Sequence, residues 1–379
     1  MQSTTPREKK FFSRYRAPLG ELPNLVEAQL KSFEWLLKEG VKEVFKEFSP
    51  IKDYSGKKFE LTIERLELGE AKYDEFYAKD HMLTYEAPLR AIVKLKNKTF
   101  NSEKEQEIFL TDFPLMTDHG TFIINGVERV IVSQLARSSG VSFTSQEIKG
   151  REFFGAKIIP ARGAWIEIDS EPDGAIYVRI DRKRKFPITS LLRVLGAKFD
   201  SDMFSLLESN PFGKSVITES LAKDSATTLE ESYIEIHKKL RDGDPASADN
   251  ARDFVESIFN LERYDFSRVG RYRFNQRFGK PMTEKELDRR TLSLDDIVTI
   301  LNEVIRLNNT QGSHPDDIDH LGFRRVRCVG EMLQQKVRVG MSRMKRNIQD
   351  RMSTIDAETT IPVQFINPRP LQAAIKEFF

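Results

Sequence analysis

The chain has 379 residues, 31% of them charged and 39% hydrophobic, and its net charge is only +2. This length exceeds what one hydrophobic core usually covers, so two domains are expected, and a surface that attracts nucleic acid has to come from local clusters of charge. The single cysteine, Cys328, excludes a disulfide framework and is typical of a reducing compartment. No run of about 18 apolar residues and no signal peptide occurs, so a cytoplasmic protein without a membrane partner is expected.

The N-terminal part of the chain predicts an arm, a helix and several strands. Residues 1–19 are basic and mostly polar, which fits either an arm that touches nucleic acid or a solvated tail. From Pro23 to Lys38, apolar residues at spacings of four, three and four predict an amphipathic helix that Gly40 ends. Alternating apolar residues predict half-buried strands over residues 59–63, 89–95 and 107–110.

The densest structural pattern lies between residues 113 and 141. Asn125-Gly126 separates Phe122–Ile124 from a second apolar run, and this is the pattern of a hairpin with a two-residue type I′ turn. Asp118 to Gly120 form a second, weaker turn signal. A compact antiparallel unit with a basic exit at Arg137 to Gly140 is therefore predicted.

The remaining chain is first strand-rich and then helical. Strands are predicted over residues 156–159, 164–168 and 176–180, the last two joined by a turn at 171–174. Helices are predicted over residues 188–195, 228–240, 251–259 and 294–307, the last with Ser293 as its cap. Two further helices follow, one over residues 329–352 with Met341, Met344 and Ile348 on its inward face, and one from Pro370. These patterns indicate a mixed, mostly helical second domain.

Two stretches could carry chemistry, and each has a structural alternative. His314 to His320 contains carboxylates and imidazoles that fit a divalent ion, as in a metal-dependent nuclease, or that cap helices and pair with arginines. The basic run Arg179 to Lys185 follows Trp165 and Tyr177, which fits either a platform for single-stranded nucleic acid or a solvated face with a core tryptophan.

Three motifs resemble the N-terminal portion of the β subunit of bacterial DNA-directed RNA polymerase. The run from Pro114 to Val141 resembles a block of that family that ends in RSPGV, with Ser139 here in place of the proline. Residues 162–165 and 179–185 resemble its RGxW and RIDRRRK elements. Residues 316–325, DDIDHLGFRR, resemble DDIDHLGNRR, with Phe323 in place of asparagine.

The resemblance implies an α+β fold, a two-domain jaw in which a β-rich domain with long helices is interrupted by an inserted strand-plus-helix domain. The expected parts are the arm at 1–19, the protrusion at 20–137 and 313–379, and the lobe at 138–312. In the family the chain continues beyond this point into the rifampicin-resistance segment and the catalytic core, so Phe379 is expected to be an artificial end.

The resemblance also implies a pocket for bases of the nontemplate strand, at Arg137, Trp165, Asp181, Ile318, Asp319 and Arg324. In it Trp165 would stack on an unpaired base, Asp319 would accept hydrogen bonds from a guanine edge, and the two arginines would hold the backbone or the base. A basic run expected to face DNA comprises Arg179, Arg182, Lys183, Arg184 and Lys185.

Two further surfaces follow from the same resemblance. Arg129, Val132 and Gln134 match positions that border the rifampicin pocket, while hairpin packing is the structural alternative. Glu103, Lys104 and Glu105 match a docking patch for the transcription-repair coupling factor, with Glu103 in place of an apolar residue.

As a family member, the chain would belong to an enzyme that transcribes DNA into RNA from ribonucleoside triphosphates. This portion would form the DNA-cleft jaw, would hold no catalytic residue, metal or cofactor, and would be inactive alone, because another subunit holds the Mg²⁺ of the assembled enzyme. The implied partners are DNA, nascent RNA, the β′, α and ω subunits, sigma, and elongation and repair-coupling factors, in a nucleoid-associated location. The alternative is a free-standing, regulatory nucleic-acid-binding protein.

Overall fold

The computed structural model describes residues 23–241, 247–355 and 360–379, so the predicted arm at 1–19 lies outside the described residues. The chain forms two compact units. Unit 1 extends to Gln134 and resumes at Val326, and unit 2, Leu135–Arg325, is inserted between its parts. Helices and several separate sheets confirm the predicted α+β class. Where the chain passes between the units, strands β7 (Gln134–Arg137) and β13 (Arg324–Arg327) pair with each other.

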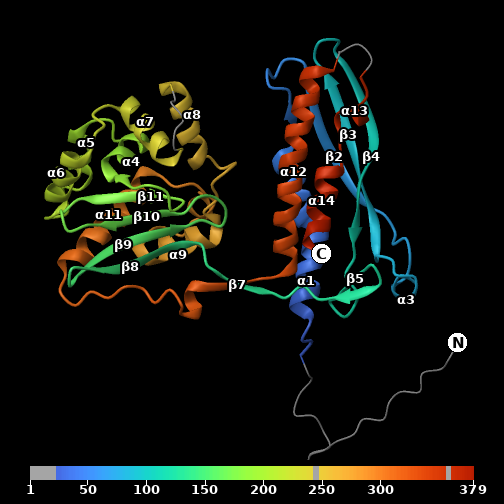
Figure 1. The fold of residues 1–379 in the computed structure, drawn as a ribbon, viewed down its shortest axis with the longest axis horizontal. Coiled ribbons are helices and arrows are strands. Elements are labelled where there is room, and N and C mark those ends of the chain that lie inside the picture. Colours follow the sequence, from blue (N-terminus) through green and yellow to red (C-terminus); the bar gives the residue numbers. More distant parts are fainter. Residues whose placement is uncertain (1–22, 242–246, 356–359) are drawn as a thin grey trace, which may run out of the picture. The chain divides into compact units, whose positions relative to one another are not determined.

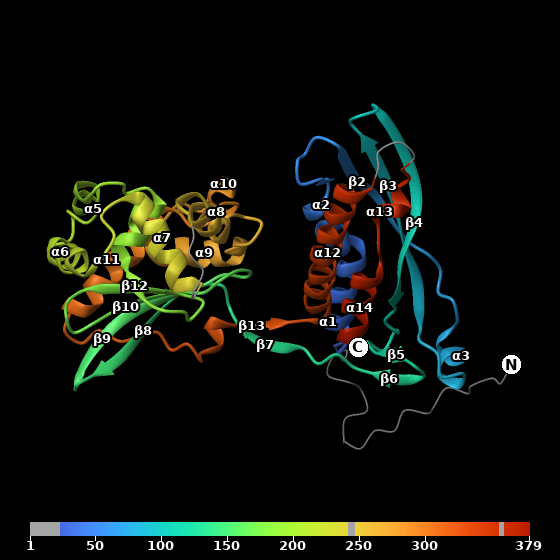
Figure 2. The ribbon, with the colours of Figure 1, turned by 45° about the horizontal axis from the view of Figure 1, so that its top comes forward.

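Unit 1 is a four-stranded antiparallel sheet with helices on one face (Figures 1 and 2). The strands, in the order in which they lie in the sheet, are β1 (Ile51–Lys52), β2 (Phe59–Leu68), β3 (Glu86–Asn97) and β4 (Ser102–Pro114). A separate hairpin consists of β5 (Phe122–Ile124) and β6 (Val127–Arg129). The helices are α1 (Glu27–Trp35), the π-helical turn η1 (Leu36–Gly40), α2 (Val41–Phe48), α3 (Glu75–Asp80), α12 (Val329–Thr354), α13 (Pro362–Phe365) and α14 (Arg369–Phe378).

Helix α12 is the centre of unit 1, since it packs against α1, α2 and α14. Its inward residues include Met341, Met344 and Ile348, as the sequence predicts. Gly330 allows α1 to come close, because a Cβ at this position would lie 2.1 Å from the Ser32 carbonyl oxygen. The Gly330 amide also donates to the Ser32 hydroxyl at 3.0 Å. The N-terminal and C-terminal parts of the chain thus share one core.

The prediction that Gly40 ends the first helix is wrong. Gly40 has helical backbone angles and lies in the π-helical turn, after which the chain continues directly into α2. Its carbonyl accepts a hydrogen bond from the side-chain amide of the buried Gln334 of α12 at 3.0 Å. A Cβ there would lie 3.2 Å from the Trp35 ring. Close contact with the Trp35 ring, rather than helix termination, therefore explains this glycine.

The Asn125-Gly126 hairpin is confirmed. Both turn residues have positive φ, 50° and 78°, as a type I′ turn requires. The Gly126 amide donates to the Leu83 carbonyl at 2.8 Å, and a Cβ on Gly126 would lie 2.7 Å from the Met82 Cα. Glycine is thus needed here both for the turn and for contact with the segment after α3.

Asp53 closes the turn between β1 and β2. Its carboxylate accepts hydrogen bonds from the Lys58 and Phe59 amides, each at 3.0 Å, and from the Ser55 hydroxyl and amide. Burial alone would raise the pKa of Asp53, but these hydrogen bonds outweigh burial and lower the pKa to about 2.

Because the pKa of Asp53 is lower in the folded chain than its ordinary value of 3.8, its stabilisation is complete above about pH 4 and is lost as the pH falls towards 2. We expect Asp53→Asn to destabilise unit 1 by about 1–2 kcal/mol at pH 7, with the difference from wild type shrinking in acid. Urea unfolding followed by Trp35 fluorescence, in a Trp165→Phe background, measures this. The control Asp80→Asn should have little effect, and a constant difference at every pH would contradict the assignment.

Unit 2 combines a five-stranded antiparallel sheet with a group of helices. The strands, in chain order and also in their order across the sheet, are β8 (Gly140–Ile148), β9 (Arg151–Ile159), β10 (Ile166–Ser170), β11 (Ile176–Ile180) and β12 (Phe186–Pro187). The helices are α4 (Ile188–Leu195), α5 (Asp200–Leu206), α6 (Gly213–Lys223), α7 (Leu229–Leu240), α8 (Ala248–Phe259), α9 (Ser267–Phe278), α10 (Glu284–Leu287), α11 (Leu294–Asn309) and the 3₁₀ turn η2 (Leu321–Phe323). Among the described residues of the whole chain, no helix combines the length and apolarity needed to cross a membrane.

The two faces of this sheet differ in chemistry. Alternate residues of β8 to β11, such as Phe143, Ile158 and Ile166, are buried in the core with the helices. On the other face Glu167 lies between its cross-strand partners Lys157 and Arg179. The sheet therefore has an apolar core face and a charged outer face.

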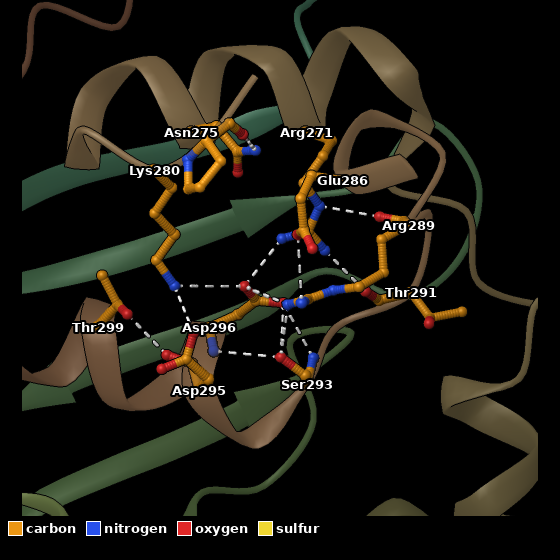
Figure 3. A network of polar contacts seen from close by, with 11 residues as sticks. Arg271, Asn275, Lys280, Glu286, Arg289, Thr291, Ser293, Asp295, Asp296 and Thr299 are labelled. Atoms are coloured by element: carbon orange, nitrogen blue, oxygen red, sulfur yellow. Dashed lines mark hydrogen bonds and ion pairs between the residues drawn. The ribbon is translucent and has the colours of Figure 1, made fainter. Parts of the chain in front are cut away.

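A buried ion pair joins α9 to α11 in unit 2 (Figure 3). Arg271 is 1% exposed and Asp296 is completely buried, and their side chains meet at 2.8 Å. Arg271 also donates to the carbonyls of Arg289 and Thr291, at 2.8 and 2.7 Å. Burial alone would raise the pKa of Asp296, but the hydrogen bond and charge of Arg271 outweigh it and lower the pKa. The pair holds α9 in one orientation against α11.

We expect Asp296→Asn to destabilise unit 2 by about 3–5 kcal/mol, because it leaves the buried Arg271 charge without its counter-ion. The control Asp295→Asn removes an adjacent, largely exposed carboxylate that pairs with Lys280 at 2.6 Å, and should cost under about 1 kcal/mol. Urea unfolding followed by Trp165 fluorescence in a Trp35→Phe background compares them. Equal losses for the two variants would show that the pair does not hold unit 2 together.

Candidate nucleic-acid interface

Trp165 and Asp181 lie side by side at one end of the β10–β11 hairpin. The Asp181 amide donates to the Trp165 carbonyl at 2.8 Å, and the Trp165 side chain is only half-buried. Asp181 and Arg182 both have positive φ, 53° and 59°. This turn places the Arg182 guanidinium over the Trp165 indole, 5.5 Å from the ring centroid. The tryptophan is therefore neither a fully buried core residue nor a bare surface residue.

The platform expected at the basic run Arg179 to Lys185 does not form one continuous strand surface. Arg179 lies in β11, but the exposed residues 181–185 form a turn and the loop that leads to β12. The two positive φ angles break the strand, because they reverse the chain after Ile180. As a result, Arg182 contacts Trp165, while Lys185 lies over the Tyr177 ring at 4.4 Å. The side chains of the basic run therefore lie against two different aromatic rings, Trp165 and Tyr177.

Arg137 and Arg324 are brought together by the pairing of β7 with β13. Next to this pair, the Ser138 amide donates to the Phe323 carbonyl at 2.9 Å. Both arginine residues are half-buried. Two cationic side chains from distant parts of the sequence thus belong to one short two-stranded sheet.

Helix α9 holds the segment that carries Ile318 and Asp319. Arg277 donates to both carboxylate oxygens of Asp316, at 2.7 and 3.0 Å, and Asp316 also exchanges backbone and side-chain hydrogen bonds with Phe143. Arg273 donates to the Gly322 carbonyl and lies over the Phe323 ring at 5.1 Å. These contacts group residues 313–325 with unit 2, whereas the sequence interpretation assigned them to the first domain.

The side chains on this segment differ in whether they have a hydrogen-bond partner. Asp316 is engaged by Arg277, and the His320 ring accepts from the Gly322 amide at 3.0 Å. Asp319 is exposed, and in the described part of the chain its carboxylate has no hydrogen bond or ion pair. The described residues contain no group of three side chains suited to hold a metal ion. The segment therefore presents Asp319 as an open hydrogen-bond acceptor.

The six expected pocket residues thus fall into two groups within unit 2. Trp165 and Asp181 form one group, and the other comprises Arg137, Ile318, Asp319 and Arg324. The segment from Asp265 to Ser267 contacts residues close in sequence to each group. The backbones of Asp265 and Arg162 hydrogen-bond to each other, and the Ser267 hydroxyl lies 2.8 Å from the Ser139 hydroxyl. The role of these six residues stays a prediction.

Sequence reasoning missed Arg273 and Arg277, which hold the Asp319 segment. Their spacing of four residues places both on one face of α9. This spacing could have indicated that the two arginines act together. Sequence reasoning also missed the contact of Arg182 with Trp165, because this contact depends on the turn after β11.

The residues expected to border a rifampicin pocket lie around β6 and β7. Arg129 is exposed and donates to the Phe379 carbonyl at 2.5 Å. Val132 is 75% exposed, and Gln134 is exposed at the start of β7. For Val132, this exposure argues against simple hairpin packing.

The expected docking patch lies on β4, the edge strand of the unit 1 sheet. Glu103 pairs with Lys94 at 2.7 Å, and the hydrogen bond from Lys94 lowers the pKa of Glu103. Lys104 donates to the Thr360 carbonyl at 2.9 Å, and Glu105 is exposed opposite Lys94. Glu103 is thus engaged in charge pairing within its own sheet.

Comparison with known proteins shows the family to which this chain belongs. A family described as RNA polymerase Rpb2, domain 2, matches residues 129–327, just over half of the chain. The chain is 43% identical, over 403 aligned positions, to the DNA-directed RNA polymerase subunit beta of Chloroflexus aggregans, and the alignment covers 98% of this chain and 33% of that protein. The chain therefore spans about a third of the length of this relative. The resemblance seen in the sequence is thus confirmed, and the chain belongs to the family of RNA polymerase β subunits that carry Rpb2 domain 2.

Proposed function

We propose that this chain is part of the β subunit of a bacterial DNA-directed RNA polymerase, which transcribes DNA into RNA from ribonucleoside triphosphates. Its family membership and its similarity to the Chloroflexus aggregans subunit support this. The partners would be DNA, nascent RNA, the β′, α and ω subunits, sigma, and elongation and repair-coupling factors, in the cytoplasm at the nucleoid. Another subunit would hold the catalytic Mg²⁺, so this portion would not transfer nucleotides alone.

Within that enzyme, we propose that unit 2 receives bases of the nontemplate DNA strand. The observation that carries the proposal is the half-buried Trp165, whose ring lies under the Arg182 guanidinium and whose carbonyl accepts a hydrogen bond from the Asp181 amide. An unpaired base can stack on an aromatic ring, and this interaction accepts any base. Selectivity would come from Asp319, whose open carboxylate can accept hydrogen bonds from the N–H groups of guanine. Arg137 and Arg324 would hold the phosphate backbone.

The assembly itself can be tested in the source cells with an antibody against this chain. We expect the antibody to detect a polypeptide several times larger than the 43.8 kDa of this chain, copurifying with a second large subunit. Mass spectrometry of the purified complex identifies its components. A stable 43.8 kDa protein without large partners would contradict the proposal and favour a free-standing nucleic-acid-binding protein.

In the assembled polymerase, we expect Asp319→Ala to change pausing or promoter unwinding only where guanine occupies the downstream nontemplate position. Loss of a two-point hydrogen bond to one base corresponds to about 1–3 kcal/mol, or roughly 5- to 150-fold in preference for guanine. Templates that differ in that one base measure the effect.

The matched control is Asp253→Ala, which removes an exposed carboxylate from α8 in the same unit. It should leave the preference for guanine unchanged. Equal slowing of Asp319→Ala at all four bases would show that Asp319 does not read the strand.

A further inference from the structure

A basic groove lies on unit 2. It follows the turn at Asp181 and Arg182 in the chain but is lined by other residues. It has a volume of about 590 Å³ and is lined by cations from β11, the turn before β12, and helices α6 and α7. These cations are Arg179, Lys183, Arg184, Lys185, Lys223 and Lys239. The last two were not among the functional residues expected from the sequence.

The groove has more positive than negative charge. Lys239 pairs with Glu235 at 3.3 Å, Lys185 pairs with Glu171, and Arg179 lies 3.8 Å from Asp169. These three carboxylates balance three of the six cations, and Arg184 is also engaged within the chain. In the part of the chain that the structure describes, the exposed ammonium groups of Lys183 and Lys223 have no ion pair. The groove therefore keeps a positive field for an external anion.

Tyr177 adds an uncharged wall to the groove. Burial, together with the hydrogen bond to Asp173, raises the pKa of Tyr177 to about 12. The phenol is therefore neutral at physiological pH and donates to Asp173 at 3.0 Å. Its ring supports Lys185 at 4.4 Å, which keeps that ammonium over the groove.

A purely structural explanation accounts for only part of this arrangement. Lys223 is the last residue of α6 and Lys239 is near the end of α7, and lysines at these positions complement the helix dipole. The dipole does not explain why both helix ends face the basic turn at 183–185. Like charges that are brought together repel each other, and a bound anion would relieve this repulsion.

The cations come from three separate parts of the chain, namely β11 with the turn before β12, α6 and α7, and a chain of phosphates can offer one anionic group to each part. The turn that places Arg182 over the indole leads directly into Lys183, Arg184 and Lys185, which line the groove. We propose that this groove binds the sugar-phosphate backbone of the same single strand whose base stacks on Trp165. The inference rests on the proposed function and adds Lys223 and Lys239 to it as backbone contacts.

The test measures binding of a fluorescent single-stranded oligonucleotide of about 16 nucleotides to the 379-residue chain over a range of salt concentrations. The variant Lys223→Gln with Lys239→Gln removes two groove cations. The control Lys214→Gln with Lys238→Gln removes two exposed lysines from the same two helices that do not line the groove. Circular dichroism melting verifies that both double variants are folded.

We expect the groove variant to bind more weakly whatever the base sequence, with a slope of log Kd against log salt that is smaller by about 1.4, or about 0.7 for each lost phosphate contact. The control should retain the wild-type slope. Equal slopes for the groove variant and wild type would overturn the proposal. Trp165→Ala separates the two sites, because it should weaken affinity at least about fivefold with an unchanged slope if only base stacking is lost.

Inorganic tripolyphosphate distinguishes the source of the phosphates. Competition by tripolyphosphate that the groove variant abolishes, together with the reduced slope, supports a phosphate-binding groove used by the strand. Tripolyphosphate binding that depends on Lys223 and Lys239 without any change in the oligonucleotide slope would overturn the assignment to the strand. It would instead identify a site for a free polyphosphate.

Discussion

The buried pair of Arg271 and Asp296 is the constraint on which the candidate interface of unit 2 depends. A guanidinium without solvent has to be paired, and here the partner comes from α11, so a rotation of α9 would take the buried Arg271 charge away from its counter-ion. Once α9 is fixed, Arg273 and Arg277 lie on its other side and hold the segment that presents Asp319. An interaction in the core thereby positions an acceptor at the surface.

The β10–β11 hairpin supplies the other half of the interface. Its inward residues belong to the core, while its end carries Trp165 and a turn in which two non-glycine residues have positive φ. Such a turn costs conformational energy that the surrounding structure has to offset. It directs Arg182 to the tryptophan and the next three residues to the basic groove. In the proposed function, one turn thus connects base stacking with backbone binding.

The features that the sequence predicts well are local. The Asn125-Gly126 hairpin and the inward face of α12 follow from neighbouring residues, because turn chemistry and helical periodicity act over a few positions. Gly40 was misread because its role depends on how the Trp35 ring packs around the π-helical turn, which apolar spacing does not reveal. The contacts of Arg182 and Arg273 likewise depend on tertiary packing. The types of residue in the candidate site could therefore be listed from the sequence, but not their grouping.

The most direct measurement is photocrosslinking of the assembled polymerase to promoter DNA that carries 6-thioguanine at single nontemplate positions. The crosslinked peptides of this chain are identified by mass spectrometry. At one downstream position, we expect crosslinks to peptides that contain Trp165 and residues 318–324, and no such crosslinks a few positions away. Crosslinks confined to other surfaces of the chain, or independent of the position of the thioguanine, would contradict the proposal that unit 2 holds a nontemplate base.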